Sequence, residues 1–314
     1  MKKAFVFPGQ GSQKVGMGRE IYENFRVAKD VFEEINDSLS QNLSDIIFNG
    51  PQETLTLTEN AQPAIMCVSI AVMRVLEEEF KINTQKYISF FAGHSLGEYT
   101  ALAASKSIDV SDTAKILSFR GKSMQKASSN RKTSMAAFMG ADLVKVEEIL
   151  SKVAKDGEIC DIANYNTETQ IVISGDDNAI NRAIKLASEI KVRTVKLDVS
   201  APFHSNYMIN TANALKYEFQ RLKFKMPEIQ IISNFNAMPF KNPKDIEDGL
   251  IKQTYSTVRW YESIKYIQNL NTNTFFEIGF GATLSGIIKR IDRNLKTTSI
   301  SNSDEIETLA KEIL

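Results

Sequence analysis

Several residue types are scarce in this chain of 314 residues, and each scarcity excludes a class of function. There are only two cysteines, Cys67 and Cys160, and two histidines. The cysteines have neither disulfide nor metal-ligand spacing and stand in apolar stretches, so we expect them in the core and expect no metal site built from cysteine and histidine. Lysine and arginine number 38, as do aspartate and glutamate, which argues against a dedicated nucleic-acid-binding protein.

Long hydrophobic runs are also missing. The longest apolar stretch, 64–76, is interrupted by Arg74 and is too short to span a membrane. The apolar run at the N-terminus ends at Pro8, too early for a signal peptide. With 43% hydrophobic residues, the chain can still form one large core or two smaller ones. We therefore expect a soluble, cytoplasmic protein without a membrane segment.

The first and last thirds of the chain alternate between predicted strands and helices, which is typical of an α/β protein with a parallel sheet. Predicted strands that read as buried are "KAFVF" (3–7), "YISFF" (87–91), "IQIISN" (229–234), "TFFEIG" (274–279) and "KTTSI" (296–300). Helices are predicted at about 17–41, 61–80, 244–254, 261–270 and 282–292, with another at the C-terminus.

The middle of the chain has a different order of elements. Strands are predicted at 134–140, 158–164, 169–174 and 192–199, and helices at 142–155 and 177–190. The resulting order, strand-helix-strand-strand-helix-strand, is that of a ferredoxin-like unit. We therefore predict an α/β core formed by 1–130 and 199–314, with a ferredoxin-like subdomain inserted at 131–198.

The clearest chemical motif is a serine between two glycines, "GHSLG" (93–97). A predicted strand precedes it and a predicted helix follows, which is the context of a nucleophile elbow. The helix N-terminus there offers free N–H groups and positive potential to a developing oxyanion. Ser95 is therefore predicted to be a nucleophile; the alternative is an ordinary turn serine that caps the helix.

Only the two histidines can supply a base of the usual kind. His94 adjoins Ser95, and adjacent side chains in a tight turn point apart, so we expect His94 to pack beneath the turn. His204 lies in a loop after a predicted strand, where the active site of a parallel sheet is built. It is the better candidate, although a lone loop histidine can also be a surface residue. Neither Asp198 nor Glu277 stands out as a third partner, and a backbone carbonyl could orient the imidazole instead.

Arg120 is the third candidate. The helix predicted at 111–127 has an apolar stripe through Leu117 and Met124, and spacings of three and four place Arg120 on that stripe. An arginine that faces inward needs an anionic partner. The alternative is a side chain whose charged head reaches water.

The motifs together resemble the malonyl-CoA:acyl carrier protein transacylases of bacterial fatty-acid synthesis, over nearly the whole chain. The resemblance rests on "FVFPGQGSQ", "TENAQPAI", "AGHSLGEYTAL", "RGKSMQ", "APFHS", "VRW" and "EIG", in this order. It implies an α/β-hydrolase-like core with a ferredoxin-like subdomain. It also implies transfer of a malonyl group from malonyl-CoA to the phosphopantetheine thiol of acyl carrier protein through a malonyl-serine, with no metal or cofactor.

The resemblance also implies roles for single residues. Ser95 would be the acylated nucleophile, His204 its base and Arg120 the group that binds the malonyl carboxylate. The other implied roles are an oxyanion hole from the backbone N–H groups of Gln10 and Leu96, a main-chain carbonyl of Gln253 that orients the histidine, a glutamine that lines the site at Gln62, and an aromatic at Phe203 that disfavours a methyl branch on the acyl chain.

The sequence departs from the family pattern in three loops. Thr257 replaces the usual proline, Phe280 replaces the proline of a Gly-Pro-Gly turn, and Ser134 replaces a glycine. These changes alter loop stiffness but leave every proposed catalytic residue in place.

The protein partner implied by the resemblance, acyl carrier protein, is strongly acidic, so a basic patch is predicted at the entrance of the site. A monomer is expected. Other possibilities are a transacylase of polyketide assembly, a serine hydrolase of the patatin or lipase type, and a catalytically silent carrier-binding module. The candidate basic residues are Lys122, Lys126, Arg131, Lys132, Lys191, Arg193, Lys289 and Arg290.

Overall fold

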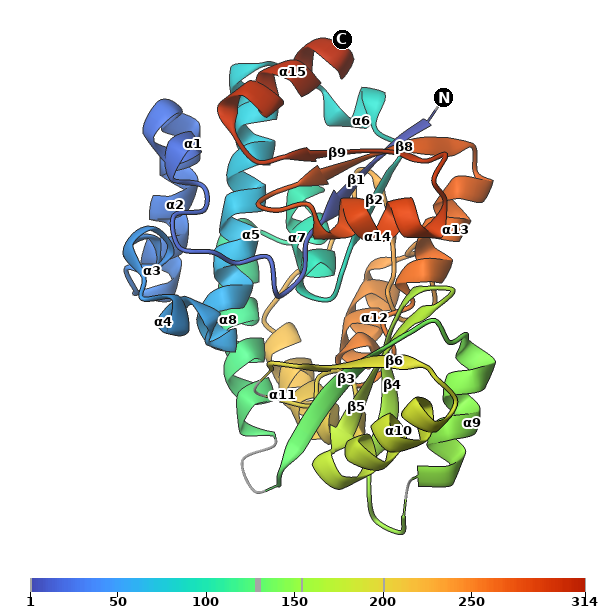
Figure 1. Cartoon of the computed structure of the whole chain (residues 1–314). Helices are drawn as coiled ribbons and strands as arrows, with labels where there is room; N and C mark the ends of the chain where they lie inside the picture. The colour runs from blue at the N-terminus through green and yellow to red at the C-terminus, as the bar shows by residue number, and fades with distance from the viewer. Residues whose placement is uncertain (1, 128–130, 154, 200, 314) are drawn as a thin grey trace.

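The computed structural model describes residues 2–127, 131–153, 155–199 and 201–313, and within them the chain forms two separate sheets (Figure 1). All neighbouring strands of the larger sheet are parallel, in the order β7-β2-β1-β8-β9. The first and last thirds of the chain both contribute to this sheet, as predicted. Its strands are β1 (Lys2–Phe7), β2 (Phe90–Gly93), β7 (Gln230–Ile232), β8 (Thr272–Ile278) and β9 (Lys296–Ile300).

The larger sheet is covered on both faces, which explains why its strands read as continuous apolar runs. Along β1, Phe5 and Phe7 point into the main core, whereas Ala4 and Val6 point into a second cluster around Trp260. The main core is formed with α1 (Arg19–Asn24), α2 (Arg26–Leu39), α5 (Thr58–Arg74), α7 (Leu96–Ala104) and α8 (Val110–Lys126). The second cluster is formed with α13 (Trp260–Asn269) and α14 (Thr283–Ile291).

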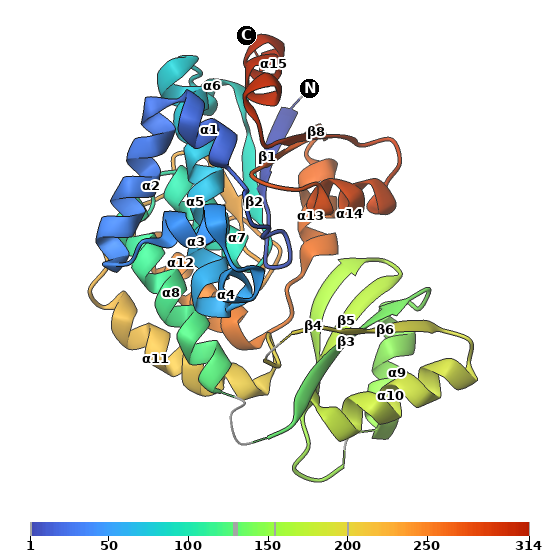
Figure 2. The same cartoon turned by 60° about the vertical axis from the view of Figure 1, so that its left-hand side comes forward.

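The smaller sheet is the predicted insertion. Its strands pair antiparallel in the order β4-β5-β3-β6 and follow the chain order β-α-β-β-α-β. Figure 2 shows it set apart from the helices of the core. The fold class is thus an α/β core with an inserted ferredoxin-like unit, while the domain limits at 131 and 198 stay a prediction. The elements are β3 (Thr133–Met139), α9 (Leu143–Val153), β4 (Cys160–Thr167), β5 (Gln170–Asp176), α10 (Asp177–Glu189) and β6 (Arg193–Leu197).

One face of the smaller sheet is turned toward the core. Phe138 packs against α9 and α10. On the opposite face of β3, Met135 and Ala137 pack against Met124 of α8 and Phe203. The strand alternation therefore places an apolar wall of the insertion opposite the C-terminal half of α8.

Some predicted elements differ from the structure. The helix predicted at 17–41 is two helices, because the backbone of Phe25 is extended and its ring packs against Phe80. Six elements in the described residues had not been predicted as separate units: α3 (Leu43–Asn49), α4 (Gln52–Thr56), the π-helical turn Val75–Glu79, α6 (Thr84–Tyr87), the 3-10 turn Asn206–Met208 and α11 (Ile209–Phe219). The two helices that complete the description, α12 (Pro243–Tyr255) and α15 (Ser303–Ile313), lie where the sequence indicates.

Candidate active site

A sharp turn joins β2 to α7 and carries Ser95. The serine has a φ of 55° and a ψ of −108°, a backbone conformation that costs energy for a residue with a side chain. Glycines on both sides make the turn possible. A Cβ on Gly93 would lie 1.9 Å from the backbone of Gly97, and one on Gly97 would lie 2.2 Å from the carbonyl oxygen of Phe7. The predicted nucleophile elbow is therefore present, at the carboxyl end of a central strand.

His204 lies beside this serine although the two are far apart in sequence. Its Nε2 is 2.8 Å from Ser95 Oγ, and its Nδ1 is 2.8 Å from the main-chain carbonyl of Gln253. A carbonyl only accepts hydrogen bonds, so Nδ1 carries the proton and Nε2 turns its lone pair toward the serine hydroxyl. Glu277 is not the orienting partner, because its carboxylate accepts hydrogen bonds from the first turn of α14.

The surroundings of His204 keep its imidazole uncharged. Burial lowers its pKa to about 3, and the nearby positive charge of Arg120 contributes to the shift. A neutral imidazole can take the proton of Ser95 at neutral pH. The other histidine, His94, is also buried with a lowered pKa, but its Nε2 is 3.0 Å from Asn166 Oδ1 in β4. Its ring thus packs under the turn, as expected from the sequence.

Arg120 points inward and is only 1% exposed. Its Nη1 donates to Gln62 Oε1 (2.8 Å), and its Nη2 donates to Gln253 Oε1 (3.0 Å) and to Ser95 Oγ (3.1 Å). None of the ion pairs found among the described residues includes Arg120, and its Nε finds no acceptor among them. Although burial lowers its pKa, an arginine stays protonated. A buried cation with N–H groups to spare therefore lies next to the nucleophile, where it can bind a carboxylate.

A cavity of about 180 Å³ opens over these side chains, between the core and the insertion. Gln10, from the loop after β1, lines this cavity. The backbone N–H groups of Gln10 and Leu96 donate to no acceptor among the described residues, so both are free to bind a substrate oxygen. Phe203 lies on the wall of the cavity. The lining residues are Gln10, Gly11, Gln13, Thr56, Gln62, His94, Ser95, Arg120, Met124, Met135, Asn164, Leu197, Asp198, Val199, Phe203 and His204.

Sequence reasoning missed Asn234, which fixes the elbow. Its Oδ1 accepts a hydrogen bond from the N–H of Ser95 (2.8 Å), and its Nδ2 donates to the carbonyl of Gly93 (2.8 Å). Asn234 is the last residue of the predicted strand 229–234 and lies two residues beyond the observed β7, which pairs with β2. A polar residue at the carboxyl end of a parallel strand was the signal that could have found it.

None of the three residues that depart from the family pattern is among those that line the active-site cavity. Thr257 donates from its hydroxyl to the carbonyl of Ile162 (2.6 Å), a link from the core to β4 that a proline could not form. Phe280 packs against the main core, between Gly279 and Gly281, which both have positive φ. Ser134 lies buried in β3.

Among the described residues there is no group of three potential His, Cys, Asp or Glu ligands for a metal ion. In the same part of the chain, no helix combines the length and apolarity needed to cross a membrane.

The geometry allows an ester to form on Ser95 and offers a positive charge to the far end of the acyl group. Fold and site together point to the class of acyl transferases. A family model described as an acyl transferase domain matches residues 4–309. The chain belongs to the malonyl CoA-acyl carrier protein transacylases of this family.

Similar proteins match over nearly their whole length. The malonyl CoA-acyl carrier protein transacylase of Bacillus subtilis (strain 168) is 41% identical, covering 98% of this chain and 95% of that protein. An acyl-carrier-protein-S-malonyltransferase from Bartonella henselae is 46% identical, with a TM-score of 0.97 and coverage of 100% and 99%. A malonyl-transacylase in complex with a type II PKS acyl-carrier protein is 32% identical, with a TM-score of 0.94 and coverage of 99% and 100%.

Proposed function

We propose that this transacylase moves the malonyl group from malonyl-CoA to acyl carrier protein in two steps, through an ester on Ser95. In the first step, His204 Nε2 takes the hydroxyl proton as Ser95 Oγ attacks the thioester carbonyl. The N–H groups of Gln10 and Leu96 stabilise the oxyanion of the tetrahedral intermediate. The carbon–sulfur bond then breaks, and His204 returns the proton to the departing CoA sulfur.

The second step reverses this sequence with a different thiol. His204 takes the proton from the phosphopantetheine thiol of the carrier, and the sulfur attacks the malonyl-serine ester. Collapse of the second tetrahedral intermediate breaks the ester bond, and His204 gives the proton back to Ser95 Oγ. The products are malonyl-carrier protein and free enzyme, so the same two side chains serve both halves of the reaction.

The observation that carries the malonyl assignment is the buried guanidinium of Arg120, 3.1 Å from Ser95 Oγ and without a carboxylate partner among the described residues. A hydrolase of neutral esters would have no use for this charge, which argues against the patatin or lipase alternative. Gln62 and Gln253 hold the guanidinium through neutral amides, so its charge is left for the substrate. A malonyl carboxylate can accept two parallel hydrogen bonds from it, and an acetyl group cannot.

We expect Arg120→Ala to lower kcat/KM for malonyl-CoA by roughly 30- to 5,000-fold, the usual cost of removing one partner of a desolvated charge pair. Transfer from acetyl-CoA should hold steady or improve, because acetyl leaves the wild-type guanidinium unpaired. Arg120→Lys should fall between the two, since the charge remains but the planar fork is lost. The measurement is kcat/KM for both acyl donors with all three proteins. An unchanged malonyl-to-acetyl ratio in Arg120→Ala would overturn the assignment.

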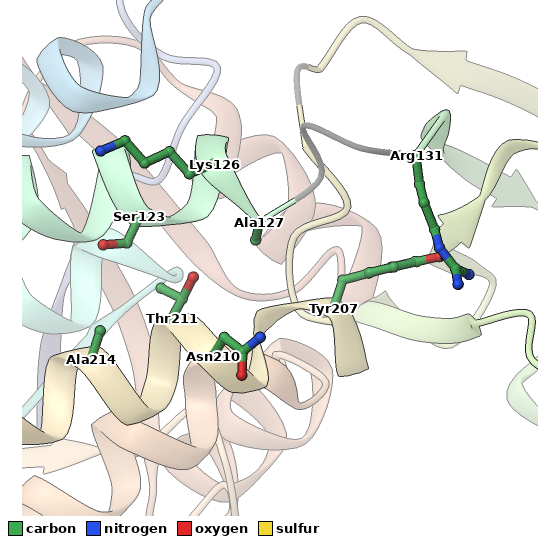
Figure 3. A pocket seen from close by; sticks show the side chains of 8 residues that line it. All are labelled: Ser123, Lys126, Ala127, Arg131, Tyr207, Asn210, Thr211 and Ala214. Atoms are coloured by element: carbon green, nitrogen blue, oxygen red, sulfur yellow. The ribbon is translucent and has the colours of Figure 1, made fainter.

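Acyl carrier protein is the partner that the family implies, and several predicted basic residues can face it. In Figure 3, Lys126 of α8 and Arg131 lie around an open cavity of about 460 Å³ between α8 and α11. Arg131 is engaged with Tyr207 Oη and Asp176, and Lys132 with Asp177. Lys122 pairs with Glu59. The candidates that are exposed and form no ion pair with a described residue are Lys126, Lys191, Arg193, Lys289 and Arg290.

Lys126 is the unpaired candidate to test first, because it is the one of these five that lines the open cavity between α8 and α11. We expect Lys126→Ala to lower kcat/KM for the carrier by about 2- to 5-fold at low salt and to weaken its salt dependence, because rim charges act mainly on association. Acylation by malonyl-CoA should change less. Lys115→Ala is the matched control, an exposed and unpaired lysine on the same helix. Equal effects of the two substitutions, or equal salt sensitivity of both half-reactions, would contradict a carrier-specific role.

Four further features are also proposed: the pathway is fatty-acid synthesis rather than polyketide assembly, the enzyme is a monomer, it acts in the cytoplasm, and it needs no cofactor. Pairing the enzyme with carriers of both pathways would decide the first of these. The cognate carrier should give the higher kcat/KM.

A further inference from the structure

Glu98 is a buried acid that no step of the proposed reaction uses. It lies in the first turn of α7, is fully buried, and accepts a hydrogen bond from Gln253 Nε2 (2.8 Å) through Oε2. Burial raises its pKa to about 7, and hydrogen bonds together with the charge of Arg120 oppose this shift. Burial of a carboxyl group costs free energy unless hydrogen bonds compensate for the lost hydration.

The side-chain amide of Gln253 is hydrogen-bonded to three residues, Ser95, Glu98 and Arg120. Its Nε2 donates to the main-chain oxygen of Ser95 (2.8 Å) as well as to Glu98, and its Oε1 accepts from Arg120 Nη2 (3.0 Å). A main-chain carbonyl can only accept, and a guanidinium can only donate. The oxygen of a carboxyl group accepts whether the group is ionised or, as its C=O oxygen, protonated. Only one of the two orientations of the amide satisfies all three neighbours.

We propose that Glu98 is a positioning residue that fixes the orientation of the Gln253 amide, so that the amide oxygen faces Arg120 and holds the guanidinium ready for the acyl carboxylate. The inference rests on the proposed role of Arg120. It makes Glu98 a determinant of acyl selectivity that acts through Gln253 without touching the substrate.

Loss of the acceptor at Glu98 would leave one N–H of Gln253 without a good partner. The nearest replacement, Asn234 Oδ1, is 3.4 Å away and already accepts from the N–H of Ser95. If the amide turned over, its NH₂ group would face the N–H groups of Arg120, donor against donor. The guanidinium would then lose one of its supports, and malonyl binding would weaken more than acetyl binding.

The test compares Glu98→Met, which keeps the approximate volume and removes the acceptor, with Glu98→Gln, whose oxygen can still accept from Gln253. We expect Glu98→Met to lower the malonyl-to-acetyl ratio of kcat/KM by about 5- to 100-fold, the range for a buried donor that loses its partner. Glu98→Gln should keep the ratio within about 3-fold of the wild type, because the hydrogen bond is retained. Thermal melts establish that each variant is folded.

Arg120→Ala and the double variant Glu98→Met/Arg120→Ala complete the cycle. If Glu98 acts through Arg120, Glu98→Met should not lower the ratio further once Arg120 is absent. An unchanged ratio in Arg120→Ala contradicts the proposed role of Arg120 itself. A lowered ratio in Arg120→Ala with an unchanged ratio in Glu98→Met overturns only the present inference, as does an equal fall for both acyl donors. If Glu98→Met and Glu98→Ala both fail to fold, Glu98 is a structural requirement and the inference is also overturned.

Discussion

Ser95→Ala is expected to lose malonyl transfer almost completely, by about 10⁴-fold or more in kcat, because the site offers no second nucleophile beside His204. The wild-type hydroxyl is 2.8 Å from the base and 3.1 Å from Arg120, and the turn holds it above the end of β2. Incubation with malonyl-CoA followed by mass spectrometry should find a malonyl adduct on the peptide that contains Ser95 in the wild type and none in the variant.

Ser188→Ala is the matched control, because this serine is exposed on α10 and lines neither the active-site cavity nor the open cavity between α8 and α11. It should form the adduct and transfer it at a normal rate. A stable adduct on another residue of the wild type, or near-normal transfer by a folded Ser95→Ala, would refute the serine mechanism. Free malonate in place of malonyl-carrier protein would point to the hydrolase alternative.

The parts of the site that could be predicted from sequence are those whose signals are local. The glycines around Ser95 are adjacent to it in the chain, and the close approach at Gly93 and Gly97 leaves room for no other residue. The helical period placed Arg120 on the apolar stripe of its helix, although the structure was needed to show that its charged head is buried. The order of strands in the insertion was likewise readable, because each strand and helix has its own periodicity.

The contacts that could not be predicted join residues far apart in the chain. Glu98 is visible as an acid within the apolar stretch "LGEYTAL", yet nothing local indicates that it meets Gln253, 155 positions away. The contacts of the Gln253 side chain could not be predicted either, because the resemblance assigned a role only to its main-chain carbonyl. The break at Phe25 was missed because it depends on packing against Phe80 rather than on a local glycine or proline.

His204→Ala carries the second large expected effect. Removal of a general base typically costs about 10² to 10⁴ in rate, and more when the base also activates the nucleophile. Acylation at neutral pH should therefore collapse while the protein remains folded. His94→Ala is the comparison: it can reduce activity, but by disturbing the turn that its contact with Asn166 supports, so we expect it to lower the melting temperature more. If His204→Ala unfolds the protein and a well-folded His94→Ala is inactive, the roles are reversed.

The low pKa of His204, about 3, adds a signature that separates a buried base from an exposed one. Because the base stays neutral, kcat/KM for acylation by malonyl-CoA should show no decline through pH 6.5 and should be constant from pH 8 to 5.

The free energy of unfolding, by contrast, should depend on pH. In the unfolded chain this histidine takes up a proton below about pH 6.5, and in the folded protein it does so only near pH 3, so the free energy of unfolding falls with falling pH across that window. Between neutral pH and pH 5 this one group should lower it by about 2 kcal/mol. Urea unfolding at pH 7.5 and pH 5 measures the loss, which should be smaller by this amount in His204→Ala. Two results together would contradict this: a fall in kcat/KM below about pH 6.5, and an equal loss of unfolding free energy in the wild type and His204→Ala. They would show that His204 titrates as an exposed histidine and is not held neutral beside Ser95.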